Sequence, residues 1–237
     1  MKILVQRLIL LLFILLSASV YSQNRITVNL DDFDALLVSG RIDVELIPSD
    51  SREMSITSLN GQPEEVSVDF ANNELKIKVR PKIDKDDVIS IQLPYKSIKK
   101  IESLAGAVIN SARDLEAEEL ELIAAAGGKI ELSVQTKSIH AKVAQVSDIV
   151  LYGTAESQDV TVNTGGNYLA YDLECQDTYI SVHAGSQGKV TASRIIDATA
   201  TSKGYVGYIG DPVSTYTKTS FGGKIASFKT RPKDDEH

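Results

Sequence analysis

Hydrophobic and polar residues alternate one by one along much of the first half of the chain. In residues 42–46, for example, Ile, Val and Leu alternate with Asp and Glu. The same period of two recurs in residues 66–70, 75–79 and 89–93. This alternation is typical of strands with one buried face and one wet face. Residues 26–95 therefore predict a set of short strands, several of them joined as hairpins, with Asn72-Asn73 as one of the turns.

A second regularity begins near Leu93, where small-residue turns recur about every 20 residues and an apolar strand residue follows each one. The turns are Gly106, Gly127-Gly128, Ser147, Gly165-Gly166, Gly185, Gly204 and Gly222-Gly223. A unit of this length cannot bury its own apolar face, so stacking on its neighbours must provide the core.

This repeat predicts an all-β fold, a parallel β-helix with coils of about 20 residues, preceded by the N-terminal strands and hairpins. A leucine-rich repeat has a similar period, but its LxxLxL pattern and its asparagine ladder are missing. The calcium-binding nonapeptide repeat needs Asp after GGxGx, and these turns lack it. Parallel crossovers favour the right-handed form, and the sequence leaves the hand open.

The stretch at residues 111–126 favours a helix by propensity, because it is rich in Ala, Glu and Leu. Within the repeat, however, Leu120 and Leu122 fall in the slots that Ala141 and Val143 occupy one unit later. Stacking overrides propensity in such cases, so we expect a strand here.

The N-terminal residues predict an export signal. Lys2 and Arg7 precede nine apolar residues at 8–16, and small residues at 17–22 allow cleavage before Gln23. An uncleaved anchor would need roughly 20 apolar residues. We therefore expect a signal peptide at 1–22, one β-helical domain at 23–229 (N-terminal strands at 23–95, coils at 96–229) and a polar tail at 230–237. The mature protein would lie in the periplasm or at the cell surface, with no membrane-spanning segment.

Composition narrows the function classes. The 237 residues include 25 Lys+Arg and 32 Asp+Glu, which argues against a nucleic-acid partner. Only one cysteine, Cys175, is present, so an intramolecular disulfide and a cysteine-built metal site are excluded. We read Cys175 as a partly buried small hydrophobe, with an intermolecular cross-link as the alternative.

Three segments together resemble a known family, the head GIN domain of auto-transporter adhesins, which is exported and common in Bacteroidetes. They are residues 33–46 (FDALLVSGRIDVEL), 93–110 (LPYKSIKKIESLAGAVIN) and 208–225 (YIGDPVSTYTKTSFGGKI). The resemblance covers about residues 25–226, and its name motif corresponds to GAVIN at 106–110. It implies a β-helical fold and an adhesin-like role, and it implies no catalytic residues.

Candidate catalytic and metal-binding residues are few. His183 lies near Asp177 and Ser181, but no nucleophile elbow accompanies them, so we read His183 as an exposed or turn-capping imidazole. His237 belongs to the polar tail. The acidic loop at 81–87 is interrupted by lysines and reads as a solvated loop, so no metal and no cofactor is expected.

Tyrosines give the most suggestive pattern, since seven of the nine fall between residues 152 and 216. The spacing between Tyr152 and Tyr171 is close to one repeat, so the two would stack on neighbouring coils as a ligand-binding face. The sequence therefore favours a non-catalytic exported binding or adhesion module for a glycan or a protein. The alternatives are a β-helix carbohydrate-active enzyme and a purely structural envelope protein. The sequence leaves the ligand and the oligomeric state open.

Overall fold

The computed structural model describes residues 24–58, 66–79 and 89–232, and every regular element in these residues is a β-strand. The all-β prediction is therefore confirmed. The predicted signal peptide, the acidic loop at 81–87 and His237 lie outside the described residues.

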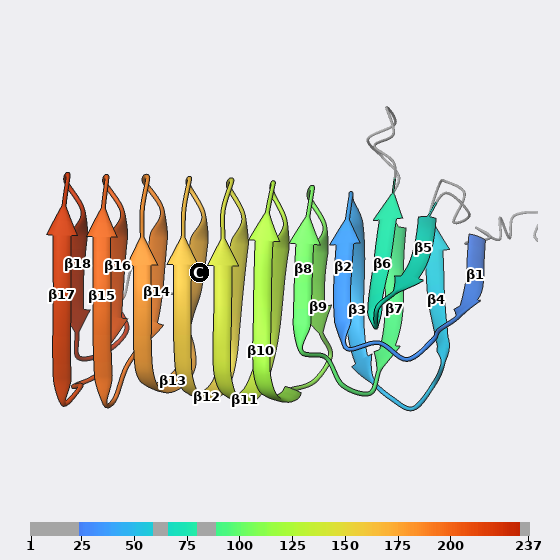
Figure 1. The fold of residues 1–237 in the computed structure, drawn as a ribbon, viewed down its shortest axis with the longest axis horizontal. Coiled ribbons are helices and arrows are strands. Elements are labelled where there is room, and N and C mark those ends of the chain that lie inside the picture. Colours follow the sequence, from blue (N-terminus) through green and yellow to red (C-terminus); the bar gives the residue numbers. More distant parts are fainter. Residues whose placement is uncertain (1–23, 59–65, 80–88, 233–237) are drawn as a thin grey trace, which may run out of the picture.

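The strands form a flattened solenoid of two sheets (Figure 1). The front sheet contains β5 (Val66–Ala71), β6 (Glu74–Val79), β2 (Ala35–Ser39), β8 (Lys100–Leu104), the C-terminal halves of β10 (Leu115–Ala125), β11 (Lys129–Val143), β12 (Asp148–Val162) and β13 (Asn167–Val182), then β15 (Ile195–Thr201) and β17 (Ser214–Ser220). The back sheet contains β1 (Asn24–Asn29), β4 (Glu53–Ser58), β7 (Ile89–Tyr95), β3 (Ile42–Pro48), β9 (Val108–Ser111), the N-terminal halves of β11, β12 and β13, then β14 (Gln187–Thr191), β16 (Tyr205–Ile209) and β18 (Lys224–Phe228).

The coils do not follow one another in simple sequence order at the N-terminal end. The pair β2–β3 lies between the pair β6–β7 and the pair β8–β9, with parallel pairing on both sides. Antiparallel strands cover the end of the stack, with β5 beside β6 and β4 beside β7. Parallel stacking therefore begins before residue 96, and β5–β6 is the hairpin predicted around Asn72-Asn73.

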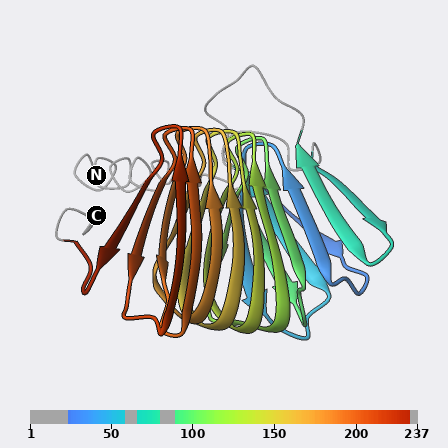
Figure 2. The same ribbon diagram turned by 60° about the vertical axis from the view of Figure 1, so that its left-hand side comes forward.

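The two sheets are joined along one edge by tight turns and along the other by wider bends, which we call the turn edge and the rounded edge (Figure 2). Most turns on the turn edge have two consecutive residues with positive φ, such as Ala126 at 53° and Gly127 at 79°. The next position is small because coils approach closely there. A Cβ on Gly128 would lie 2.1 Å from the carbonyl oxygen of Ser103. This close approach explains the small-residue repeat in the sequence.

The repeat length varies from coil to coil. Ile101 pairs with Leu122 on the next coil, and Leu120 pairs with Ile139 on the coil after that. The strand predicted at 111–126 is confirmed as β10. Its expected pairing with the next coil is wrong, because it is displaced by two residues, one step of the inward–outward alternation. Leu122, and not Leu120, aligns with Ala141, because the coil after β10 is shorter than the coil before it.

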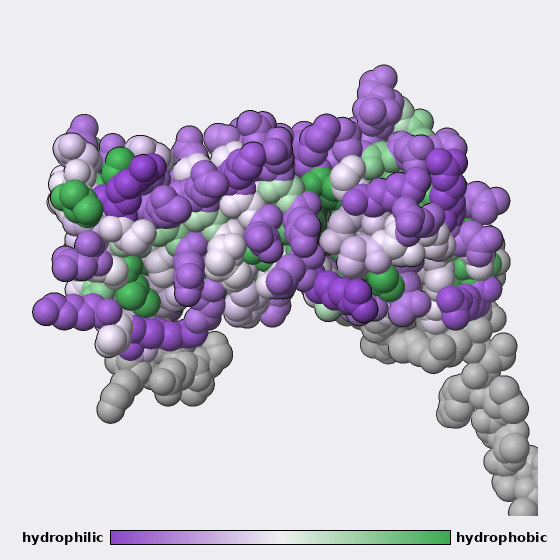
Figure 3. Space-filling view, turned by 90° about the horizontal axis from the view of Figure 1, so that it is seen from below, coloured by the Kyte–Doolittle hydropathy of each residue, from purple (hydrophilic) through white to green (hydrophobic). Residues whose placement is uncertain are grey.

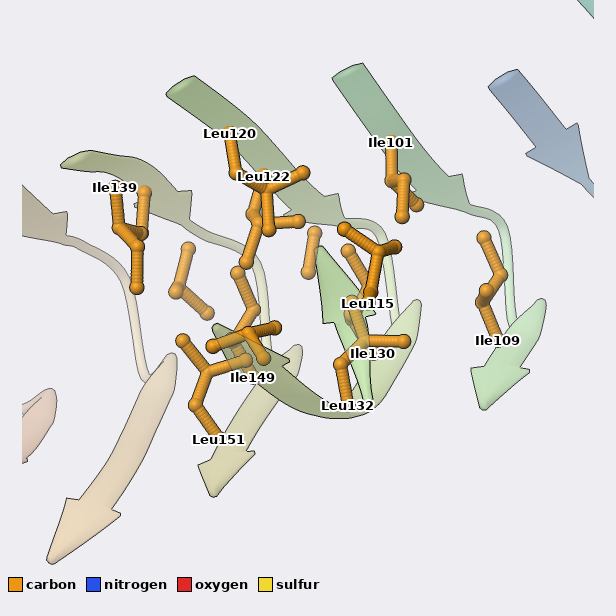
Figure 4. Close-up of a cluster of buried hydrophobic side chains, with 14 of the residues drawn as sticks. Ile101, Ile109, Leu115, Leu120, Leu122, Ile130, Leu132, Ile139, Ile149 and Leu151 are labelled. Atoms are coloured by element: carbon orange, nitrogen blue, oxygen red, sulfur yellow. The ribbon is translucent and has the colours of Figure 1, made fainter. Parts of the chain in front are cut away.

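The core is one continuous cluster between the two sheets (Figure 4), where side chains such as Ile101, Ile109 and Leu122 point inward toward one another. The later coils keep the same inward register. Val160 and Ile180 are paired and buried, whereas Thr161 beside Val160 is half-buried on the outside.

Candidate functional site

Tyr152 lies on the outside of the back sheet, in the N-terminal half of β12. Its side chain is 37% exposed. Its hydroxyl donates a hydrogen bond to Glu131 Oε1 at 3.4 Å, and Lys129 Nζ is 2.9 Å from the other oxygen of that carboxylate. Partial burial, and then the charge of Glu131, raise the pKa of Tyr152. The phenol is therefore a neutral hydrogen-bond donor with an accessible ring face.

Tyr171 lies on the same sheet, but it does not stack on Tyr152. Val150 pairs with Leu169, whereas Tyr152 pairs with Asp172, because β13 has one extra residue at this point. This β-bulge shifts the register, so the expected one-above-the-other arrangement of the two tyrosines is wrong. The two tyrosines would pair directly only if β13 lacked this extra residue.

The ring of Tyr171 is half-buried along the outer surface of the following coils. Lys189 Nζ is 5.9 Å from the ring centre. A Cβ on Gly207 would lie 2.2 Å from the Tyr171 hydroxyl oxygen, so the missing side chain of Gly207 makes room for the phenol. Next to Tyr171, Asp172 forms an ion pair with Arg231 at 2.8 Å. The back-sheet surface thus carries the exposed ring of Tyr152 and the half-buried ring of Tyr171. The ion pairs Lys129–Glu131 and Asp172–Arg231 lie beside them.

The front sheet carries two more exposed tyrosines that sequence reasoning did not select, Tyr179 and Tyr216, which are 41% and 61% exposed. They lie in one outward row, because Tyr179 pairs with Asp197 and Asp197 pairs with Tyr216. In the sequence, these two tyrosines are separated by about two repeat lengths rather than one. Because the coils differ in length, only the register of the intervening strand reveals this row.

The conceivable Ser–His–Asp triad is not assembled. His183 Nδ1 contacts Thr201 Oγ1 at 2.8 Å, on the next coil. The carboxylate of Asp177 accepts a hydrogen bond from Arg194 Nε at 2.7 Å, with a second contact from the same guanidinium. Asp177 therefore forms an ion pair with Arg194, and the contact between His183 and Thr201 joins two neighbouring coils.

Cys175 is predicted from the sequence to be a partly buried small hydrophobe, and at 4% exposure it is fully buried. Its Sγ donates to the carbonyl oxygen of Asp177 at 3.3 Å. Burial raises the pKa of the thiol. A protonated, buried thiol is a poor nucleophile.

A shallow groove follows the rounded edge across several coils. Small side chains in register form its floor, namely Ala117, Thr136, Ala155 and Cys175. Polar residues such as Glu118, Lys137 and Gln176 form its rims. Figure 3 views this edge, where pale and hydrophobic residues run between hydrophilic ones.

Three carboxyl groups of the described coils are held in the ionised form by basic side chains beside them. The pKa values of Glu118, Glu131 and Asp177 are lowered by hydrogen bonds from Lys137, Lys129 and Arg194 respectively. A general acid needs a pKa raised toward neutrality. Within residues 24–58, 66–79 and 89–232, no three His, Cys, Asp or Glu side chains gather as metal ligands.

Comparison with known families shows which family the chain belongs to. A family described as "Putative auto-transporter adhesin, head GIN domain" matches residues 32–212. The chain belongs to this family. The resemblance read from residues 33–46, 93–110 and 208–225 is thereby confirmed. No curated protein is significantly similar to the chain in sequence.

Several solved structures share the fold at low sequence identity. A "putative adhesin" from Bacteroides fragilis has a TM-score of 0.77 and 16% identity, over 87% of this chain and 97% of its own. A "putative adhesin" from Parabacteroides merdae has a TM-score of 0.69 and 18% identity, over 87% and 96%. A "putative lipid binding protein" from Parabacteroides distasonis has a TM-score of 0.70 and 20% identity, over 87% and 97%. In the part of the chain that the structure describes, no helix has the length and apolarity needed to cross a membrane.

Proposed function

We propose that this head GIN chain is a non-catalytic exported module that binds or adheres to an extracellular or envelope glycan or protein. The adhesin description of the family supports this role, as do the descriptions of two structural neighbours. The observation that carries the proposal is the shape of the molecule. Two long sheets present continuous outer faces, and solenoids bind partners on such faces through many modest contacts (Figure 1).

The proposed location is the periplasm or the cell surface, after cleavage of residues 1–22. The basic start, the short apolar run and the small residues before Gln23 support export. Mass spectrometry of the exported protein tests it. A first residue of Gln23 is expected, and a retained apolar run at 8–16 would contradict cleavage.

The back-sheet surface around Tyr152 and Tyr171 is the proposed ligand-binding face. Tyr152 offers a ring face and a hydroxyl oxygen that can accept a hydrogen bond, at low cost in side-chain entropy. Tyr171, seated over Gly207, shapes the adjacent surface. The ion pairs Lys129–Glu131 and Arg231–Asp172 flank the two rings and offer polar contacts.

The alternative is a β-helix enzyme acting on polysaccharides. A glycoside hydrolase of this kind needs a carboxyl pair of which one member is held protonated. The lowered pKa values of Glu118, Glu131 and Asp177 disfavour it among the described residues. We therefore favour binding without turnover.

The test is a binding screen of the mature protein on immobilised glycans and on extracellular-matrix and envelope proteins. We expect reversible binding to at least one probe, which is recovered intact. Tyr152→Ala should weaken that binding about tenfold, which corresponds to about 1.4 kcal/mol. Phe221→Ala is the matched control, because Phe221 is 85% exposed on the turn edge, away from both faces. Release of new reducing ends from a glycan would contradict the non-catalytic role, and binding to no probe would contradict the binding role.

A further inference from the structure

The outer face of the front sheet carries a second surface with features of its own. Its central row runs across four successive coils, in the order Asp159, Tyr179, Asp197 and Tyr216, each paired with the next in register. All four side chains are exposed. We call these four residues the front row.

The two rings of the front row are separated by two strand spacings. Adjacent strands lie about 4.8 Å apart, so the attachment points of Tyr179 and Tyr216 are about 9.6 Å apart along the solenoid axis. This is about the length of two sugar rings in an extended chain. A ring face at every second coil therefore suits a polymer of sugars that lies along the axis.

The neighbouring row supplies hydroxyl groups. Thr161, Ser181 and Thr199 follow one another in register, and each is half-buried beside the front row. Between the two tyrosines, Asp197 is exposed. Among the ion pairs of the described residues, none includes Asp159 or Asp197. Both carboxylates are thus available as acceptors for hydroxyl donors.

The surface is unlike the centre of a protein–protein interface. Such centres are rich in large apolar side chains and poor in charge. Here the outward positions hold tyrosine, carboxylate and hydroxyl groups, with Lys142 and Lys218 at the two ends of the hydroxyl row, which favours a partner covered with hydroxyls. Lys142 and Lys218 offset the charges of Asp159 and Asp197, so the face carries no excess of one sign and favours an uncharged partner.

A hollow continues the front row toward the N-terminus. It is lined by Lys100, Glu121, His140 and Asp159, which form the same outward row on the preceding coils, and by side chains beside them. The track therefore extends over seven coils, from Lys100 to Tyr216, along one face of the molecule.

We infer that the front row and this hollow bind a neutral, unbranched glycan that lies along the solenoid axis, with sugar faces packed on Tyr179 and Tyr216. The inference rests on the proposed binding function and adds to it a ligand class and a second face, opposite the one bearing Tyr152. Carbon–hydrogen faces of sugars pack on the electron-rich faces of aromatic rings. Asp197 accepts hydrogen bonds from the hydroxyl groups of the sugars between the two rings.

The experiment measures binding of the mature protein to soluble neutral oligosaccharides of two to eight hexose or N-acetylhexosamine units. Polygalacturonate fragments of the same lengths serve as the acidic comparison. We expect affinity for a neutral series to rise with length from two units to at least four. Tyr179→Ala and Tyr216→Ala should each weaken it about tenfold, which corresponds to about 1.4 kcal/mol. Tyr179→Trp should retain it, since the ring face remains.

Phe221→Ala is the control, because it removes an exposed aromatic side chain from the turn edge and should change neutral-glycan affinity less than twofold. Thermal unfolding of each variant checks that the fold is intact. Neutral-glycan binding that is unaffected by Tyr179→Ala and Tyr216→Ala overturns the front row. Binding of acidic glycans or proteins alone overturns the inference and leaves the proposed function standing. Binding of no probe overturns both.

Discussion

At the scale of single residues, the structure distinguishes two kinds of close approach to a glycine. A Cβ on Gly207 would meet the end of a side chain, the Tyr171 hydroxyl, at 2.2 Å. A Cβ on Gly128 would meet a backbone carbonyl oxygen, that of Ser103, at 2.1 Å. A side chain can rotate away at little cost, whereas a backbone shift would separate two stacked coils.

This difference gives a paired prediction. Gly207→Ala should change the free energy of unfolding by less than about 1 kcal/mol, while Tyr171 moves outward and becomes more exposed. Gly128→Ala should cost about 2 kcal/mol or more, within the range for overpacked sites. Chemical denaturation measures both values, and tyrosine fluorescence quenching reports the exposure of Tyr171. Equal losses of stability in the two variants would contradict the distinction.

The inward and outward register of β12 gives a second residue-scale prediction. Val160 is 1% exposed inside the coil, so Val160→Asp buries an unpaired charge and should cost several kcal/mol. Thr161 faces outward, and Thr161→Asp should stay within roughly half a kcal/mol of the parent. Thermal unfolding of the two variants measures the difference. Similar shifts for the two would reverse the assigned register.

At the scale of elements, the turn edge contains one coil whose turn is poorly matched to its sequence. Gln145 and Val146 both have φ of 57°, and Val146 is 75% exposed. A β-branched residue is a marked outlier in this left-handed region. The corresponding second position is glycine in several other turns, such as Gly127 and Gly165. Pairing with the neighbouring turns, through Val146 N–H to the Thr164 carbonyl at 3.2 Å, holds the strained conformation.

Val146→Gly should therefore stabilise the protein, by about 1 kcal/mol, because glycine adopts this conformation without the steric cost. The reciprocal change Gly127→Val should destabilise it by a similar amount or more, since φ there is 79°. Differential scanning calorimetry of the two variants measures both. A loss of stability on Val146→Gly would show that the side chain of Val146 contributes contacts that outweigh its strain.

The elements also show where sequence reasoning succeeds and where it ends. Alternation and small-residue turns predict β10 correctly against its helical propensity, because coil stacking fixes which side chains are buried. The same reasoning misplaces Leu120 by one alternation and pairs Tyr152 with Tyr171, because it assumes a constant coil length. A bulge or a shortened bend shifts the register without changing the pattern of alternation on either side of it. Register, and with it the front row, therefore needs the structure.

At the scale of the whole molecule, the two ends of the solenoid differ. The N-terminal end is covered by the antiparallel strands β4, β1 and β5. Among the described strands, β17 and β18 at the other end have a neighbour on one side each. Such edges invite pairing with another chain unless they are made polar. The inward slots of β17 hold Thr215, Thr217 and Thr219, in register with Ile196, Ala198 and Ala200 of the preceding coil.

These three threonines are exposed, and Lys218 lies between two of them. A terminal repeat with polar residues in its core slots keeps a stack from growing, because a further coil would have to bury those hydroxyl groups. Replacing Thr215, Thr217 and Thr219 together by Val should remove this protection and expose an apolar strand edge. We expect larger, concentration-dependent species relative to the parent, measured by analytical ultracentrifugation. The control replaces Thr161, Thr199 and Thr201 by Val, because these residues lie in strands paired on both sides. If only the control variant associates, or if neither variant does, the polar threonines in the inward slots of β17 are not what prevents further coils from stacking on this end.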